Sequence, residues 1–207
     1  PFIYWQDPFG DFIEFKNSNY QPMAECGKQV IYLYQEEETD VQVYVEPSGG
    51  YTITEPAYND GWKVSAKPDG ELYNYADETV YPYLFWEGYA HEYYRPDQGF
   101  VVAREKVEEF LIEKLTRLGL VEHEYDEFIE FWLPRMQNRN YYFVTFMPKE
   151  DFDEIAPLSV YPEPDTVIRV FMDYEGLDSY VKVEEQKIIT PERIGFTVVE
   201  WGGALHK

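Results

Sequence analysis

The sequence contains little cysteine and little histidine, and these shortages exclude several kinds of site. Cys26 is the only cysteine, so the chain has no internal disulfide and no zinc site built from cysteines. The three histidines, His91, His123 and His206, have none of the fixed spacings of a metal-binding helix or finger. A zinc enzyme would require residues from distant parts of the chain to converge, and we expect no such metal.

Positive charge is also scarce. The chain holds 17 lysines and arginines against 40 aspartates and glutamates, and the resulting net charge of -23 at pH 7 is spread over both halves. Affinity for nucleic acid depends on neutralising phosphates with basic side chains, so nucleic acid and anionic membranes are poor partners. No apolar run approaches the length of about 20 residues that a membrane helix needs, so we expect no membrane insertion.

Familiar catalytic motifs are missing as well. The sequence has no Gly-x-Ser-x-Gly elbow, no Walker loop and no Gly-x-Gly-x-x-Gly fingerprint. Cys26 could act as a nucleophile only with a basic partner, and no adjacent histidine or asparagine supplies one, which favours a structural or buried thiol. The chain begins at Pro1 without a basic or apolar leader, from which we expect a processed or trimmed end.

Aromatic side chains, in contrast, are abundant. They make up 19% of the sequence and include 20 tyrosines, 14 phenylalanines and five tryptophans. Disordered chains are poor in such residues, so we expect an ordered protein despite the high net charge. A domain of this size buries about 70% of the surface that its unfolded chain exposes, which is enough for a core without disulfides.

The first half of the chain is predicted to be an arm followed by a β-rich region. Residues 1–28 carry large aromatic side chains among turn-forming residues, and we interpret them as an arm that docks its rings on the main body. Over residues 29–100, β-forming runs alternate with turns that contain Asp-Gly or Gly-Gly, which predicts an antiparallel sheet or a small sandwich. The expected strands are 29–34, with a charged connection to 41–45, then 51–54, 62–66, 71–75 and 80–86.

Two amphipathic helices are predicted in the middle of the chain. Apolar residues recur at helical spacing over 104–118 and again over 125–133, after which Pro134 should end or kink the second helix. Residues 149–155 are expected to form a loop or a short turn of helix. Further strands are expected at 141–147, 166–174, 180–184 and 196–201.

These elements predict the α+β class, with a hairpin-rich antiparallel sheet or small sandwich packed against two central amphipathic helices. The helical pair is short enough to pack on the sheets, so we assign residues 29–207 to a single domain and residues 1–28 to the arm. Within the domain we distinguish a β-rich part (29–100), the helical pair (104–138) and a mixed β part (141–203).

Four stretches resemble a known protein family. They include the strings VIYLY, YPYLFWEG and GFTVVEWGG and lie at Cys26–Tyr34, Tyr81–Gly88, Gly99–Val102 and Gly195–Gly203. Their order and spacing resemble a family of uncharacterised, exported bacterial proteins found largely in uncultured lineages, although Gln29 stands where that family has Lys-Pro. The family has no established activity, so the resemblance implies a location outside the cell or in the cell envelope and no chemistry.

The segment 83–94 is the densest group of residues suited to a site. It places Glu87 and His91 among rings with polar tips, a set that can hold a sugar or a peptide. The alternative is a core strand in which Trp86 packs inside and Glu87 is solvated. Glycines that follow Trp201 would also allow a ligand to approach closely. The residues we predict to contact a ligand are Tyr83, Trp86, Glu87, Tyr89 and Trp201.

If the protein is an enzyme, Glu87 and His91 are the expected general base and its partner, because a carboxylate can orient an imidazole that titrates near neutral pH. On an extended strand their Cα atoms would lie about 13 Å apart. A bend at Gly88 would therefore be needed to bring them into contact.

Calcium is a second candidate ligand of the acidic turns. Asp7 with Asp11, or Asn59 with Asp60, could supply oxygen ligands to Ca2+. No stretch matches the EF-hand loop, and ordinary turn chemistry also explains these residues. We therefore expect no cofactor, with Ca2+ as the alternative.

The sequence as a whole favours a non-catalytic, exported binding or structural module of the bacterial envelope or extracellular matrix. Such a module would contact a protein or glycan partner through aromatic residues, which give large contact area at low entropic cost. The alternative is a hydrolase that acts on glycans or peptides with a carboxylate as its acid/base, for which two convergent carboxylates would be required.

Overall fold

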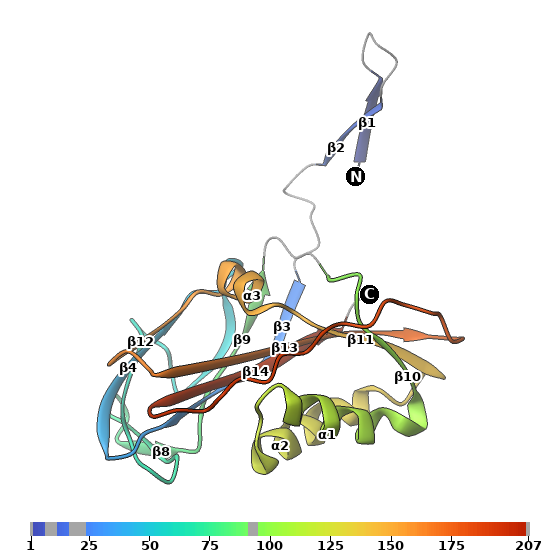
Figure 1. Cartoon of the computed structure of the whole chain (residues 1–207). Helices are drawn as coiled ribbons and strands as arrows, with labels where there is room; N and C mark the ends of the chain where they lie inside the picture. Colours follow the sequence, from blue (N-terminus) through green and yellow to red (C-terminus); the bar gives the residue numbers. More distant parts are fainter. Residues whose placement is uncertain (1, 7–11, 17–23, 91–94, 206–207) are drawn as a thin grey trace.

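The computed structural model describes residues 2–6, 12–16, 24–90 and 95–205. Its main body has three layers, which can be followed in Figure 1. The helices α1 (Val107–Arg117) and α2 (Glu122–Trp132) cover one face of a seven-stranded sheet, and a five-stranded sheet with the short helix α3 (Lys149–Ile155) covers the other face. The predicted α+β class, with a sandwich of sheets and two central helices, is confirmed.

The seven-stranded sheet joins strands that are far apart in the sequence. All neighbours in it are antiparallel except β13 and β14, which run parallel. Strands in the middle of this sheet are covered on both faces, which is why β14 is an almost continuous run of buried residues. In spatial order the strands are β10 (Phe100–Ala103), β11 (Tyr141–Phe146), β13 (Thr166–Leu177), β14 (Thr197–Leu205), β3 (Ala24–Tyr34), β9 (Leu84–Ala90) and β5 (Tyr51–Glu55).

The five-stranded sheet packs on the larger sheet through alternate residues. In β4, Val41, Val43 and Val45 are buried while Asp40 and Gln42 are exposed, as expected for a strand with one face in a core. These valines belong to the core between the two sheets. In spatial order the strands are β12 (Leu158–Tyr161), β4 (Thr39–Val45), β6 (Trp62–Ala66), β7 (Leu72–Asn74) and β8 (Thr79–Tyr81).

Both predicted helices are present. Val107, Leu111 and Leu115 recur every four residues in α1 and are all fully buried against the larger sheet. The helix α2 ends at Trp132, and Pro134 lies in the 3-10 turn η3 (Leu133–Arg135) that follows it; another such turn, η2 (Arg104–Lys106), precedes α1. None of the helices formed by the described residues is long and apolar enough to cross a membrane.

Three expectations about strands are corrected. Residues 180–184 alternate in polarity but form no strand. Among the described residues, their backbone is bonded next to the larger sheet at one place, where the Gly99 amide donates to the Glu184 carbonyl at 3.0 Å. The two strands expected at 29–34 and 41–45 are present but lie in different sheets, so the charged connection between them crosses from one layer to the other. The expected strand 80–86 is divided between β8 and β9, which belong to different sheets. The short strands β10 and β12 were not predicted.

The beginning of the chain also differs from the expected division. The strand β1 (Phe2–Gln6) pairs antiparallel with β2 (Phe12–Lys16), so residues of the expected arm form a hairpin. The strand β3 begins at Ala24 and lies inside the larger sheet, so the main body starts before residue 29. The docking of the arm's rings concerns side chains outside those that the structure describes.

Candidate functional site

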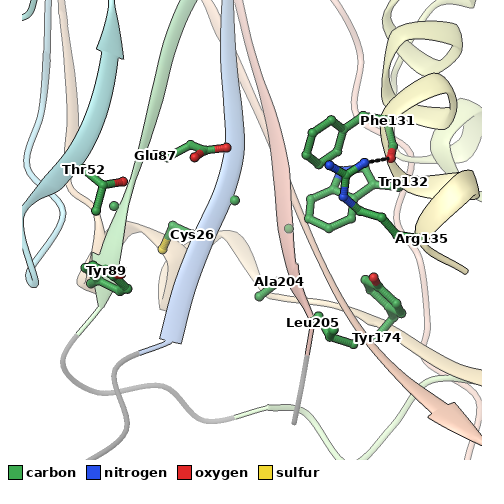
Figure 2. Close-up of a pocket in the computed structure, with 13 residues that line it drawn as sticks. Cys26, Thr52, Glu87, Tyr89, Phe131, Trp132, Arg135, Tyr174, Ala204 and Leu205 are labelled. Carbon is green, nitrogen blue, oxygen red and sulfur yellow. Dashed lines mark hydrogen bonds between the residues drawn. The ribbon is translucent and has the colours of Figure 1, made fainter.

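A groove of about 540 Å³ lies on the helix-covered face of the larger sheet, beyond the end of α2. Figure 2 shows one wall formed by Thr52 and Tyr89 and the opposite wall formed by Phe131, Trp132 and Arg135. The groove therefore separates the end of the helix pair from the strands β9 and β5. The remaining lining residues are Cys26, Gly27, Glu87, Gly88, Tyr174, Gly203, Ala204 and Leu205.

Glycines make this part of the sheet hollow. Gly27, Gly88 and Gly203 belong to the neighbouring strands β3, β9 and β14, and none of them has a side chain to fill the space. A Cβ atom at Gly203 would lie 3.1 Å from Cζ2 of Trp132 and 2.5 Å from the carbonyl oxygen of Met172. The indole of Trp132 can lie against the sheet only because this position is glycine.

A β-bulge at Lys28 lies next to the groove residues Cys26 and Gly27. The pairing of β3 with β9 shifts register between Cys26 and Gln29, and Lys28 within this shift has a φ of 44°, in the left-handed region. Its backbone amide donates a hydrogen bond to Oε1 of Glu87 at 3.2 Å. The half-buried Glu87 carboxylate, which Figure 2 shows directed toward β3, is thus engaged with the backbone of the neighbouring strand.

Two cations lie on the ring of Phe131. Nζ of Lys28 is 4.9 Å from the ring centroid, and the guanidinium carbon of Arg135 is 3.5 Å from it. The Arg135 side chain folds back and donates to the carbonyl oxygen of Phe131 at 2.5 Å, the bond drawn in Figure 2. Neither cation forms an ion pair with any carboxylate in the part of the chain that the structure describes. Arg135 lines the groove, whereas Lys28 is not one of its lining residues, and Nζ of Lys28 also lies 5.6 Å from the ring centroid of the buried Trp201.

The structure separates the five predicted ligand contacts. Glu87 and Tyr89 line the groove. Tyr83 lies elsewhere, with its ring edge-on to Tyr32 at 5.6 Å between centroids. The predictions that Trp86 and Trp201 contact a ligand are wrong. Neither side chain has any exposed surface, so neither can reach a ligand.

The two tryptophans fill cores on opposite sides of the larger sheet. Trp86 lies between the sheets, where its indole N–H donates to Oε1 of Glu200 at 2.9 Å. Trp201 packs under the helices, with its ring 5.3 Å from that of Phe128. A sequence pattern of rings cannot by itself distinguish a ring that fills a core from one that meets a ligand.

Several groove residues that the sequence did not indicate come from the end of α2 and from the turn η3 that follows it. Phe131 and Arg135 are four residues apart, a spacing that places side chains together on a helical surface. That spacing was a local signal for their contact. Their position opposite Glu87 depends on how α2 packs on the sheet, which no local pattern specifies.

Acid/base and thiol chemistry find little support in the groove. Glu87 is the one carboxylate among the described lining residues, and His91 lies outside the described residues. Burial, with a smaller contribution from Glu200, raises the pKa of the Cys26 thiol to about 12, so it is protonated at neutral pH. The nucleophile alternative for Cys26 therefore lacks a thiolate.

The two acidic turns that could hold Ca2+ differ in what the structure describes. Asp7 and Asp11 lie outside the described residues. Asn59 has a φ of 49°, and its side-chain amide donates to the carbonyl of Ala57 at 3.4 Å, which is turn chemistry. Over residues 2–6, 12–16, 24–90 and 95–205, no three histidine, cysteine, aspartate or glutamate side chains gather in a way that could hold a metal ion.

Comparisons with known proteins add no relative. A scan of protein-family models, a search of curated proteins and a search of solved structures each find no match to this chain. The resemblance to a family of exported bacterial proteins therefore stays a prediction. The functional argument depends on the groove alone.

Proposed function

We propose that this protein is a non-catalytic binding module that holds part of a glycan in the groove at the end of α2. The observation that carries the proposal is the composition of its walls. Tyr89 and Phe131 offer half-buried rings, while Thr52, Glu87 and Arg135 offer hydrogen-bonding groups. Rings that stack on a sugar face and a few polar groups that meet its hydroxyls are what a glycan site requires.

A glycan suits the groove better than a peptide does. Extended peptides are usually held by main-chain bonds to an open strand edge. The strands under the groove, β14, β3 and β9, each pair with a neighbour on both sides, so their backbone groups are used within the sheet. Side chains therefore supply the polar contacts, and they match hydroxyl groups.

The hydrolase alternative lacks its second carboxylate in the described groove. Most glycosidases use two carboxyl groups about 5 to 9.5 Å apart. Glu87 is alone among the described lining residues, and its carboxylate is bonded to the Lys28 amide. A role in binding and in holding the bulge explains Glu87 without a reaction. The location in the cell envelope or outside the cell belongs to the same proposal and depends on the family resemblance.

Binding to a panel of neutral and acidic bacterial and plant oligosaccharides tests the proposal. We expect saturable binding by at least one glycan, a loss of at least tenfold in affinity with Phe131→Ala, and no new reducing ends after prolonged incubation. Tyr161→Ala is the matched control, because Tyr161 is 59% exposed and does not line the groove. Absence of binding across the panel, or equal losses in both variants, contradicts the proposal, and release of sugar products would favour the hydrolase.

A further inference from the structure

We propose that the outer edge of β10 binds an extended, basic peptide segment of another protein, which adds to the larger sheet as a further strand. The site lies in a second groove of about 490 Å³, which we call the edge groove. It shares no lining residue with the groove at the end of α2. The inference therefore does not depend on the proposed function.

The first observation is the direction of the backbone groups in β10. This strand is the outermost one of the larger sheet and leads through η2 into α1 (Figure 1). Just beyond it, the Arg104 amide donates to the Asn140 carbonyl at 3.0 Å, in register with the pairing of β10 and β11. Hydrogen-bonded residues alternate along an antiparallel pair, so Val101 and Ala103 point their amides away from β11. Neither amide has a backbone partner among the described residues.

The second observation is that the chain itself pairs with this edge at one position. Gly99 lies two residues before Val101, on the same side of the backbone, and its amide donates to the Glu184 carbonyl at 3.0 Å. Gly99 and Glu185 thereby form an isolated parallel bridge. The edge thus accepts a strand where one reaches it. Within the described part of the chain, the segment that contains Glu185 makes no further bridge to β10, so the edge at Val101 and Ala103 stays open.

The residues of β10 do not block this open edge. Proteins commonly protect an exposed edge strand with proline, lysine or a bulge. The strand β12, at an edge of the smaller sheet, is bounded by Pro157 and Pro162. In contrast, β10 has the sequence Phe-Val-Val-Ala and pairs with β11 without a shift in register. The backbone of a partner can therefore approach it directly.

The walls of the edge groove suit the side chains of an added strand. Gly99 and every residue of β10 line the groove, together with residues of α1 and of the segment 180–185. Successive side chains of a strand point to opposite faces of a sheet, so every second side chain of the peptide would meet the half-buried ring of Phe110 on the helix side. Tyr180, which is 61% exposed, offers a second ring of the kind that anchors partners.

The charge of the edge groove favours a basic peptide. Its two lysines are each paired with a glutamate of the groove, Lys106 with Glu109 at 2.8 Å and Lys114 with Glu113 at 2.9 Å. Glu185 forms no ion pair with any other described residue. A lysine or arginine of the peptide can therefore pair with Glu185.

The charge of the whole protein supports the same partner. The net charge of -23 attracts a cationic segment and opposes the pairing of two copies of this chain through their β10 edges. An extended segment of a basic partner therefore fits the edge better than a second copy does.

Two heptapeptides with blocked ends, KTVTVTK and ETVTVTE, are the probes, because they share a β-forming core and differ in charge. In amide-resolved NMR titrations, we expect half-saturation by the basic peptide at a concentration about tenfold lower than by the acidic one. When the basic peptide is bound, the Val101 and Ala103 amides should exchange with solvent about tenfold more slowly. The basic peptide N-methylated at its three central residues lacks the donors of a strand and should bind about tenfold more weakly.

Two variants test the edge from the side of the protein. Glu185→Gln should reduce the preference for the basic peptide by about threefold, as for a surface ion pair. Val101→Pro removes the outward amide while leaving the bonds to β11, and it should weaken binding of the basic peptide by about tenfold. Glu150→Gln is the matched control, since Glu150 is exposed, forms no ion pair among the described residues and does not line the edge groove. Thermal midpoints show whether each variant is folded, and the N-methylated peptide tests the same bonds on the wild-type protein.

The outcomes separate this inference from its alternatives. Equal titration by the two heptapeptides, no shift with either, undiminished binding of the N-methylated peptide, or an equal effect of Glu185→Gln and Glu150→Gln overturns it. Slow exchange of the Val101 amide without peptide, together with dimers in sedimentation, overturns it in favour of a second copy. Binding of glycans and its dependence on Phe131 are measured separately, so either proposal can fail while the other stands.

Discussion

The Glu87 carboxylate in β9 accepts a hydrogen bond from the Lys28 amide in β3, with 3.2 Å between Oε1 and the nitrogen. This bond lies at the bulge where the two strands shift register. It couples Glu87, which lines the groove, to the bulged backbone of the neighbouring strand. Substitutions at either residue can therefore separate a structural role from a role in ligand recognition.

Replacing Glu87 by alanine should leave the Lys28 amide without its acceptor. We expect the free energy of unfolding to fall by about 0.5–1.5 kcal/mol, whereas Glu87→Gln, whose amide oxygen can still accept the bond, should lose less. Urea denaturation of the three proteins measures the difference, with Glu46→Ala as an exposed control outside the groove. Equal losses in the alanine and glutamine variants would show that the negative charge, rather than the bond, is what matters.

Lys28→Gly should be neutral or slightly stabilising. Relief of the left-handed conformation is worth about 1–2 kcal/mol. This gain outweighs a loss in stability of about 0.4–1 kcal/mol, which arises because glycine gives the unfolded chain more conformational freedom. Lys28→Met retains the Cβ atom and its strain, so its stability should stay near that of the wild type. Urea denaturation compares the three proteins, and a glycine variant less stable than the wild type by more than about 1 kcal/mol would contradict the strained geometry.

Leu111→Ala should be strongly destabilising. Leu111 has no exposed surface and lies between α1 and the larger sheet, so the shortened side chain leaves a cavity. The expected loss is about 2–5 kcal/mol in the free energy of unfolding. Ile112→Ala, on the neighbouring and 39% exposed position, is the control and should lose far less. Thermal and urea denaturation compare the two.

The fold was predictable where the signals are local. The bounds of β6, Trp62–Ala66, were predicted to the residue because turns with Asp-Gly steps enclose an alternating run. The helix α1 was predictable because its buried residues repeat every four positions. In both cases a few neighbouring residues contain all the information that is needed.

Long-range pairing was not predictable in the same way. The strand β3 pairs with β14 and β9 rather than with β4, its successor in the chain, and the short edge strand β10 has few residues to mark it. The groove depends on the same kind of information. Glu87 was identified from its neighbours, but its opposition to Phe131 and Arg135 arises from the packing of a helix on a sheet.

Arg169→Met should destabilise the protein more than any substitution in the groove. Nε of Arg169 donates to the fully buried Glu200 carboxylate at 2.6 Å, and Nη1 donates to Asp153 at 2.7 Å. Removing the arginine leaves a buried charge without its partner, which costs about 3–5 kcal/mol. The double variant Arg169→Met with Glu200→Gln should recover part of this loss, because the remaining side chain is neutral. No recovery in a double-mutant cycle would place the cost in packing instead.

The ion pair between Asp153 and Arg169 also makes the free energy of unfolding depend on pH in the acidic range. Burial alone would raise the pKa of Asp153, but hydrogen bonds from Lys149 and Arg169 outweigh it and hold that pKa below its ordinary value of 3.8. A carboxyl group whose pKa is lowered by folding stabilises the protein above its unfolded pKa, and this contribution is lost as the pH falls through the folded value. Asp153→Asn should therefore reduce stability at pH 7 and flatten its decline below about pH 4. An unchanged acid titration of the unfolding free energy would contradict this account.

Cys26 should resist thiol reagents until the protein unfolds. Its side chain is 1% exposed, and burial, assisted by Glu200, raises its pKa from 9.0 to about 12. At pH 8 only about one thiol in ten thousand is ionised, and the thiolate is the reactive form. Labelling with an aromatic disulfide reagent across a urea series should follow the unfolding transition. Rapid labelling of the native protein at pH 8 would place the thiol in contact with solvent and restore it as a candidate nucleophile in the groove.

The raised pKa of Cys26 also makes stability depend on pH in the alkaline range. Because folding raises this pKa, the free energy of unfolding should fall as the pH rises from 9.0 toward 12, and this fall should be smaller in Cys26→Ala.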